Sequence, residues 1–172
     1  MNITFSSLLL MISLSLTFLT ISCVEDDPCD GVTCFNGGSC EDGDCDCSTA
    51  FGYEGAMCET EVNDKFTEFS MLMESCSNAQ PRTITISISE RVTSPITIRF
   101  DGLANGFFQA DGIIDGAIGR DFTIPRAGFG GQEIEGSGTM RPDGSAIDIS
   151  YSIYDPANPQ TPEYTCTGII TK

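Results

Sequence analysis

Alternation of apolar and polar residues dominates the chain from Lys65 onward. It is clearest in segments 83–88, 96–100 and 147–153, where every second residue is apolar and the residues between are mostly Thr, Ser or Asp. A period of two is typical of β-strands with one face in a core and the other in water. The pattern therefore predicts an all-β domain over residues 65–172.

Asp-Gly pairs punctuate this region at 101–102, 111–112, 115–116 and 143–144. They supply the positive backbone angles that tight hairpins need, which predicts an antiparallel meander. Eight strands are expected, near residues 66–75, 82–89, 95–101, 106–111, 113–119, 131–140, 146–154 and 163–171. The first segment also has the apolar spacing of a helix. Eight hairpin-linked strands form either a closed up-and-down barrel or a sandwich.

An uncharged apolar run covers residues 3–22 and ends in Ser22-Cys23. Such a run is typical of an export signal, which is not part of the fold. The small residue before Cys23 resembles a bacterial lipobox, which implies that residues 1–22 are a cleaved signal peptide and that Cys23 carries lipid. The acidic residues that follow resemble the signal that takes Bacteroidota-type lipoproteins to the outer face of the outer membrane. The alternatives are a soluble secreted protein and, because about 20 apolar residues can span a bilayer, an uncleaved transmembrane helix.

Six of the nine cysteines lie between residues 29 and 58, with the spacing C-x4-C-x5-C-x4-C-x-C-x10-C. A segment of about 30 residues buries too little apolar surface to fold without cross-links. Together with Asn36-Gly37-Gly38 and the run from Gly52 to Glu59, this spacing resembles an EGF-like module over residues 29–59. The resemblance implies three disulfides: Cys29–Cys40, Cys34–Cys45 and Cys47–Cys58. Zinc is the alternative interpretation of paired thiols, but the chain has no histidine and no two CxxC pairs.

If Cys23 carries lipid, two cysteines remain, Cys76 and Cys166, at the end of the first predicted strand and inside the last. These strands are neighbours in an up-and-down barrel, so a disulfide between them closes it and removes an exposed edge. We therefore expect a barrel, with a sandwich as the alternative. The region is similar to lipocalin-like barrels, and to β domains of bacterial surface lipoproteins that share short motifs found here at 74–76, 136–139 and 166–167.

Acidic residues outnumber basic ones by 25 to 8, which gives a net charge of −17 at pH 7. Twelve of the acidic residues and no basic residue lie between Cys23 and Asp64, which leaves 13 acidic and 8 basic residues from Lys65 onward. The predicted linkers, residues 23–28 and 60–64, lie within or at the end of this acidic part. Such a field repels phosphate backbones, so nucleic acid is not an expected partner. Solubility is the simplest role for the charge, and a cationic partner is the alternative.

Calcium is the metal to consider, because Glu25, Asp26 and Asp27 precede the first cysteine of the predicted module as they do in some EGF-like modules. The family's second calcium element is an Asp or Asn after the third cysteine, followed by an aromatic residue. It has no counterpart in the loop 41–44, and calcium needs oxygen ligands from several points of the chain. We therefore predict no metal and no cofactor, with these three residues as the calcium candidates.

Catalysis is not expected. The absence of histidine excludes Ser-His and Cys-His nucleophile systems. Glu133 and Glu135 are two residues apart, but their strand face is opposite Ile134 and is predicted to lie in water. The run 128–131 lacks the lysine of a phosphate-binding loop.

The expected function is that of a non-catalytic surface lipoprotein, held at the membrane by lipid on Cys23 and contacting a surface protein or a glycan. Candidate contact aromatics are Tyr53, Phe107, Phe108 and Phe129. The alternative is a lipocalin-like carrier of an apolar ligand, which requires a connected cavity of several hundred Å³ in the barrel. A carboxylate-based glycosidase is the third hypothesis.

Overall fold

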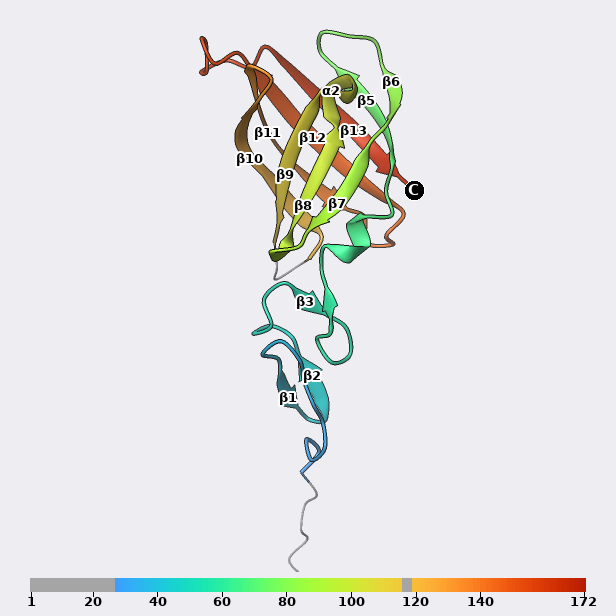
Figure 1. Cartoon of the computed structure of the whole chain (residues 1–172). Helices are drawn as coiled ribbons and strands as arrows, with labels where there is room; N and C mark the ends of the chain where they lie inside the picture. Colours follow the sequence, from blue (N-terminus) through green and yellow to red (C-terminus); the bar gives the residue numbers. More distant parts are fainter. Residues whose placement is uncertain (1–26, 116–118) are drawn as a thin grey trace, which may run out of the picture.

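The computed structural model describes residues 27–115 and 119–172 and is almost entirely β (Figure 1). Its N-terminal part, here called the cysteine-rich module, covers residues 27–62. It contains two short hairpins, β1 (Ser39–Glu41) with β2 (Asp44–Asp46), and β3 (Tyr53–Glu54) with β4 (Thr60–Glu61). Three disulfides cross-link it: Cys29–Cys40, Cys34–Cys45 and Cys47–Cys58. These are the pairs that the family resemblance implied.

The C-terminal part is a nearly closed, barrel-like sheet of nine antiparallel strands in the order β6-β5-β13-β12-β11-β10-β9-β8-β7. The strands are β5 (Met71–Cys76), β6 (Arg82–Thr85), β7 (Ser87–Arg91), β8 (Ser94–Gly102), β9 (Phe108–Ile114), β10 (Asp121–Phe129), β11 (Gln132–Met140), β12 (Ala146–Tyr154) and β13 (Tyr164–Thr171). A 3-10 turn, η2 (Asp64–Phe66), precedes the sheet, and a short helical turn, α2 (Leu103–Gly106), links β8 to β9. The predicted all-β meander is confirmed.

The sheet curls because its two edge strands are consecutive in the chain. Only Ile86 separates β6 from β7, and it is buried, with its backbone N–H donating to the Ser70 carbonyl at 2.8 Å. The segment 82–91 therefore pairs with β5 in its first half and with β8 in its second. The segment 82–89 was expected as one strand, and the break at Ile86 divides it into two.

The first and last strands of the sheet domain are neighbours, as a barrel requires. Cys166 in β13 lies directly opposite Cys76 in β5, and a disulfide joins them with 4.0 Å between the Cα atoms. The bridge links positions 90 residues apart in the sequence. It fastens the two ends of the meander together.

Three sequence predictions about element boundaries were wrong. Asp111-Gly112 is not a turn, because both residues lie inside the single strand β9, where two strands were expected. Strand β10 was missed because Pro125 interrupts its pattern, and the proline occupies a bulge where the register shifts between Ile124 and Ala127. The first strand begins at Met71, later than predicted, because residues 64–66 form η2.

Buried side chains fill the interior of the sheet. Three phenylalanines contact one another there: the Phe66 ring meets that of Phe122 edge to face, with centroids 6.0 Å apart, and the tilted ring of Phe100 lies 5.2 Å from that of Phe122. Inward-facing glycines leave room for large side chains on the neighbouring strands. A Cβ at Gly138 would lie 2.4 Å from the Phe122 ring, and one at Gly168 would lie 2.6 Å from Leu72. Large residues opposite glycine give the interior its close packing.

The cysteine-rich module packs against one end of the sheet domain (Figure 1). Val62 is buried in the core of the sheet domain, and the fully buried Asn63 donates its backbone N–H to the Pro95 carbonyl at 3.2 Å. Gly52, in the left-handed conformation, lies so close to Pro95 and Ile96 that a Cβ would clash with both. The predicted linker 60–64 is thus an ordered junction that contains β4 and the start of η2.

Candidate functional site

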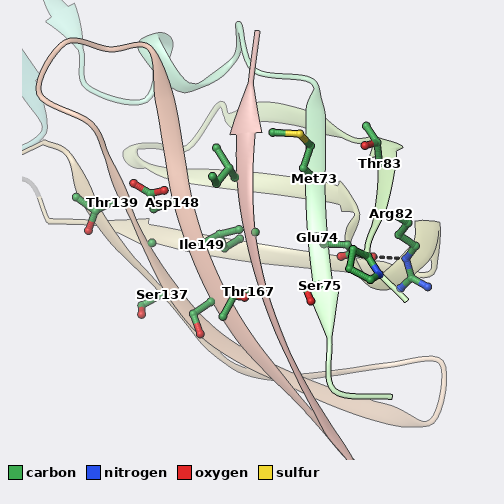
Figure 2. Close-up of a pocket in the computed structure, with 15 residues that line it drawn as sticks. Met73, Glu74, Ser75, Arg82, Thr83, Ser137, Thr139, Asp148, Ile149 and Thr167 are labelled. Atoms are coloured by element: carbon green, nitrogen blue, oxygen red, sulfur yellow. Dashed lines mark hydrogen bonds and ion pairs between the residues drawn. The ribbon is translucent and has the colours of Figure 1, made fainter. Parts of the chain in front are cut away.

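A groove of about 770 Å³ runs over the outer face of the sheet across β6, β5, β13, β12 and β11 (Figure 2). The strand period of two sets its lining, because the side chains between the buried positions of each strand point outward. Ser75, Thr167 and Ser150 illustrate this placement: Thr167 is paired with Ser75 on one side and with Ser150 on the other. The groove is therefore built from the polar half of the alternating pattern.

Hydroxyl groups dominate the groove lining. They belong to Ser75, Thr83, Ser137, Thr139, Ser150 and Thr167. The Thr139 hydroxyl donates to Asp121 at 2.7 Å, whereas the other five make no side-chain hydrogen bond to the part of the protein that the structure describes. Each free hydroxyl offers one donor and two acceptor positions. Met73 and Ile169 add apolar surface between them.

Asp148 is an acidic, outward-facing side chain of the groove. Its two carboxylate oxygens receive hydrogen bonds from Arg141, at 2.8 Å from Nη2 and 3.0 Å from Nε. This bidentate pair lowers the pKa of the Asp148 carboxyl. The carboxylate therefore stays ionised and can accept hydrogen bonds from a ligand's hydroxyls.

A buried polar cluster lies behind the groove, inside the sheet. Glu74, only 3% exposed, forms an ion pair with Arg82 at 2.6 Å and accepts the Asn105 backbone N–H at 3.2 Å. Its other carboxylate oxygen accepts a hydrogen bond from the Tyr151 hydroxyl, which in turn accepts the Ala104 N–H at 3.0 Å. Burial, and then the hydrogen bond to Glu74, raise the pKa of Tyr151, so the phenol stays neutral and donates.

The Glu74 cluster holds the chain in an unusual shape. Ala104 and Asn105, which donate to it, both have left-handed backbone angles, with φ of 49° and 67°. Since both carboxylate oxygens of Glu74 are occupied by protein donors, the cluster fastens α2 over the end of the sheet. The cluster was not predicted, although the sequence contains a signal for it: Glu74 occupies an inward position between Leu72 and Cys76 in an alternating strand.

The predicted site residues are distributed over the molecule. Glu133 forms an ion pair with Arg126 at 2.6 Å, and Glu135 is exposed; both lie on the outer face of β11 and neither lines the groove. Arg126 also stacks over Tyr154, 3.8 Å from the ring centroid. This carboxylate pair thus belongs to the polar surface.

The four nominated aromatics have different environments. Phe107 is 70% exposed and Phe129 41%, whereas Phe108 is buried, with its ring centroid 6.1 Å from that of Phe129. Tyr53 is half-buried in the cysteine-rich module. Phe107 directly follows α2, at the end of the sheet domain remote from the module (Figure 1).

The lipidation and calcium candidates Cys23, Glu25 and Asp26 lie outside the described residues. Asp27 is described, and its carboxylate accepts the Cys29 backbone N–H at 2.9 Å. Over residues 27–115 and 119–172, one set of metal-ligating side chains converges: Glu74 with Cys76 and Cys166. The two sulfurs form a disulfide, so they offer no thiolate to a metal.

No protein-family model matches this chain, and no curated protein is significantly similar to it. Among the helices of the described residues, none has the length and apolarity to cross a membrane.

Proposed function

We propose that this chain is an exported, non-catalytic binding module of the cell surface that contacts a glycan through the outer-face groove. The observation that carries the proposal is the row of free hydroxyls beside the ionised Asp148. Sugars present hydroxyls that need donors and acceptors at several points, and this face offers both. A surface protein is the alternative partner.

Four disulfides support export, because such bonds persist in oxidising compartments outside the cytosol. In this proposal residues 29–59 are an EGF-like spacer, residues 1–22 a signal peptide, and Cys23 the lipid attachment point at the membrane. The sheet domain then faces away from the membrane, because the cysteine-rich module separates it from Cys23 along the sequence.

Two arrangements favour binding over the other hypotheses. Buried side chains fill the interior of the sheet domain, which is where a lipocalin-like carrier would hold its apolar ligand. This packing favours the outer groove as the binding site. The carboxylates nominated for glycoside hydrolysis are engaged elsewhere, since Glu133 forms an ion pair with Arg126.

Thr167→Tyr tests this proposal, because it places a large ring in the middle of the groove on an exposed position. Thr165→Tyr is the matched control, being exposed on the same face of the same strand but outside the groove. Both proteins are screened against a panel of neutral and acidic polysaccharides. We expect binding by the native protein and the control, with at least a tenfold loss for Thr167→Tyr. Equal binding by all three would refute the groove as the site.

A further inference from the structure

A second pocket, here called the basic pocket, lies at the end of the sheet domain next to the cysteine-rich module. Its volume is about 390 Å³, within the range of small-molecule sites. Four basic side chains line it: Lys65, Arg120, Arg141 and Lys172. The chain has 8 basic residues against 25 acidic ones, so half of its cations line one pocket.

The fold brings these four cations together from distant parts of the sequence. Gly119 has a left-handed φ of 65° and packs so that a Cβ would lie 3.1 Å from the Lys65 Nζ. The backbone carbonyl of the next residue, Arg120, accepts a hydrogen bond from the Met140 N–H at 2.9 Å. This bond places Arg120 beside the turn that begins with Arg141. The Thr171 carbonyl accepts the Ser70 N–H at 3.0 Å and so brings Lys172 to the same end.

Arg120 differs from the other basic residues in its partners. The remaining seven all form ion pairs, whereas Arg120 has none among the residues that the structure describes. Lys65 and Arg141 pair with Glu54 and Asp148, two acids outside the pocket lining. Partly exposed ion pairs of this kind are weak, so they hold the cations only loosely.

Two acidic side chains also line the pocket. Glu68 is paired with Lys172, and one Asp143 oxygen accepts both the Ser145 hydroxyl, at 2.7 Å, and the Ser145 N–H, at 3.1 Å. These hydrogen bonds lower the pKa of Asp143, so it remains an anion whose charge is bonded within its own turn. Counting only the lining residues, four cations and two carboxylates give the pocket a side-chain charge of +2, in a chain of net charge −17.

The floor of the pocket is apolar. Phe69 and Met140 are both buried, and the Lys172 ammonium lies 5.4 Å from the centroid of the Phe69 ring. An apolar floor lowers the local dielectric constant, which strengthens the attraction between a guanidinium and an anion. The planar guanidinium of arginine also matches the geometry of oxyanions, which it binds with two parallel hydrogen bonds.

We propose that the basic pocket binds an oxyanion group, a carboxylate or a sulfate, with Arg120 as its principal ligand and Lys65, Arg141 and Lys172 in support. The proposal does not depend on glycan binding in the groove. The two sites are nevertheless adjacent, because the Arg141–Asp148 pair joins the lining of one to the lining of the other.

Calorimetric titration of the full-length protein in a non-ionic detergent tests the proposal. Sodium glucuronate, sodium sulfate and glucose are the probes, at constant ionic strength. We expect saturable binding of at least one anion and none of glucose. Arg120→Gln should weaken anion binding about tenfold or more, because a charge-assisted bidentate contact is lost. Arg120→Lys should bind with intermediate affinity, since it keeps the charge but loses the planar donors.

The matched control is Arg126→Gln, which removes one positive charge from the outer face away from the pocket and should leave the dissociation constant within twofold. Preference for glucuronate would identify an acidic saccharide as the source of the oxyanion, and preference for sulfate an inorganic ion or sulfate ester. Thr167→Tyr should bind the anion normally, which separates this site from the groove. The proposal is wrong if glucose binds equally, if Arg120→Gln binds like the native protein, or if no anion saturates by about 10 mM.

Discussion

At the scale of single residues, Glu74 is the position where we expect substitution to be least tolerated, because its carboxylate lies inside a mostly apolar interior. Replacing it with alanine leaves the Arg82 guanidinium and the Tyr151 hydroxyl without their acceptor and frees the Asn105 N–H. Breaking a buried ion pair from one side is costly, so we expect Glu74→Ala to lower the free energy of unfolding by about 3 kcal/mol. Urea denaturation followed by far-UV circular dichroism measures this loss.

Two further variants make the Glu74 experiment specific. Glu135→Ala removes an exposed carboxylate from β11 and should change stability by less than about 0.5 kcal/mol. Tyr151→Phe removes only the hydroxyl that links Glu74 to Ala104, so its cost should be about 1–3 kcal/mol, the range for a buried group left unpaired. If Glu74→Ala is as stable as Glu135→Ala, the cluster does not hold α2 in place.

At the scale of elements, the sequence located β8 and β12 closely, but its alternation continues across Ile86, where the chain passes from one edge of the sheet to the other. It misled at Asp111-Gly112, because an inward glycine that accommodates the Phe100 ring has the same local sequence as a hairpin turn. It also missed β10, whose pairing survives Pro125 only through a bulge. The groove and the basic pocket were not predicted, because each joins segments whose proximity depends on the closed order of the strands.

A prediction at this scale concerns the register of β11. Gly138 faces inward, and a Cβ there would lie 2.4 Å from the Phe122 ring and 2.7 Å from the Asp148 carbonyl oxygen. The backbone of a paired strand cannot move away from such a clash as a flexible side chain can. Gly138→Ala should therefore lower the free energy of unfolding by about 1–3 kcal/mol. Ser137→Ala, on the exposed face one residue earlier, is the control and should be nearly neutral. Equal melting temperatures for the two variants would contradict the inward placement of Gly138.

At the scale of the whole molecule, charge and cross-links divide the chain in the same way. The cysteine-rich module carries a dense negative charge, and its three disulfides connect near neighbours, each pair 11 residues apart. The sheet domain has a large apolar core, all the basic residues and a single long-range disulfide. The first part is held by covalent bonds and the second mainly by burial, so the two should respond differently to reduction.

The long-range disulfide gives the most decisive test of the fold. Changing Cys76 and Cys166 together to serine frees a loop of 90 residues, for which the chain-entropy treatment gives about 4–5 kcal/mol as an upper value. A small domain has about 5–15 kcal/mol in total, so the melting temperature of the sheet domain should fall by roughly 10 °C or more. Scanning calorimetry measures this fall, and non-reducing peptide maps should still contain the three linkages of the cysteine-rich module.

An unchanged melting temperature would show that the bridge contributes little to barrel closure. A peptide joining Cys76 or Cys166 to any cysteine between residues 29 and 58 would contradict the strand order itself.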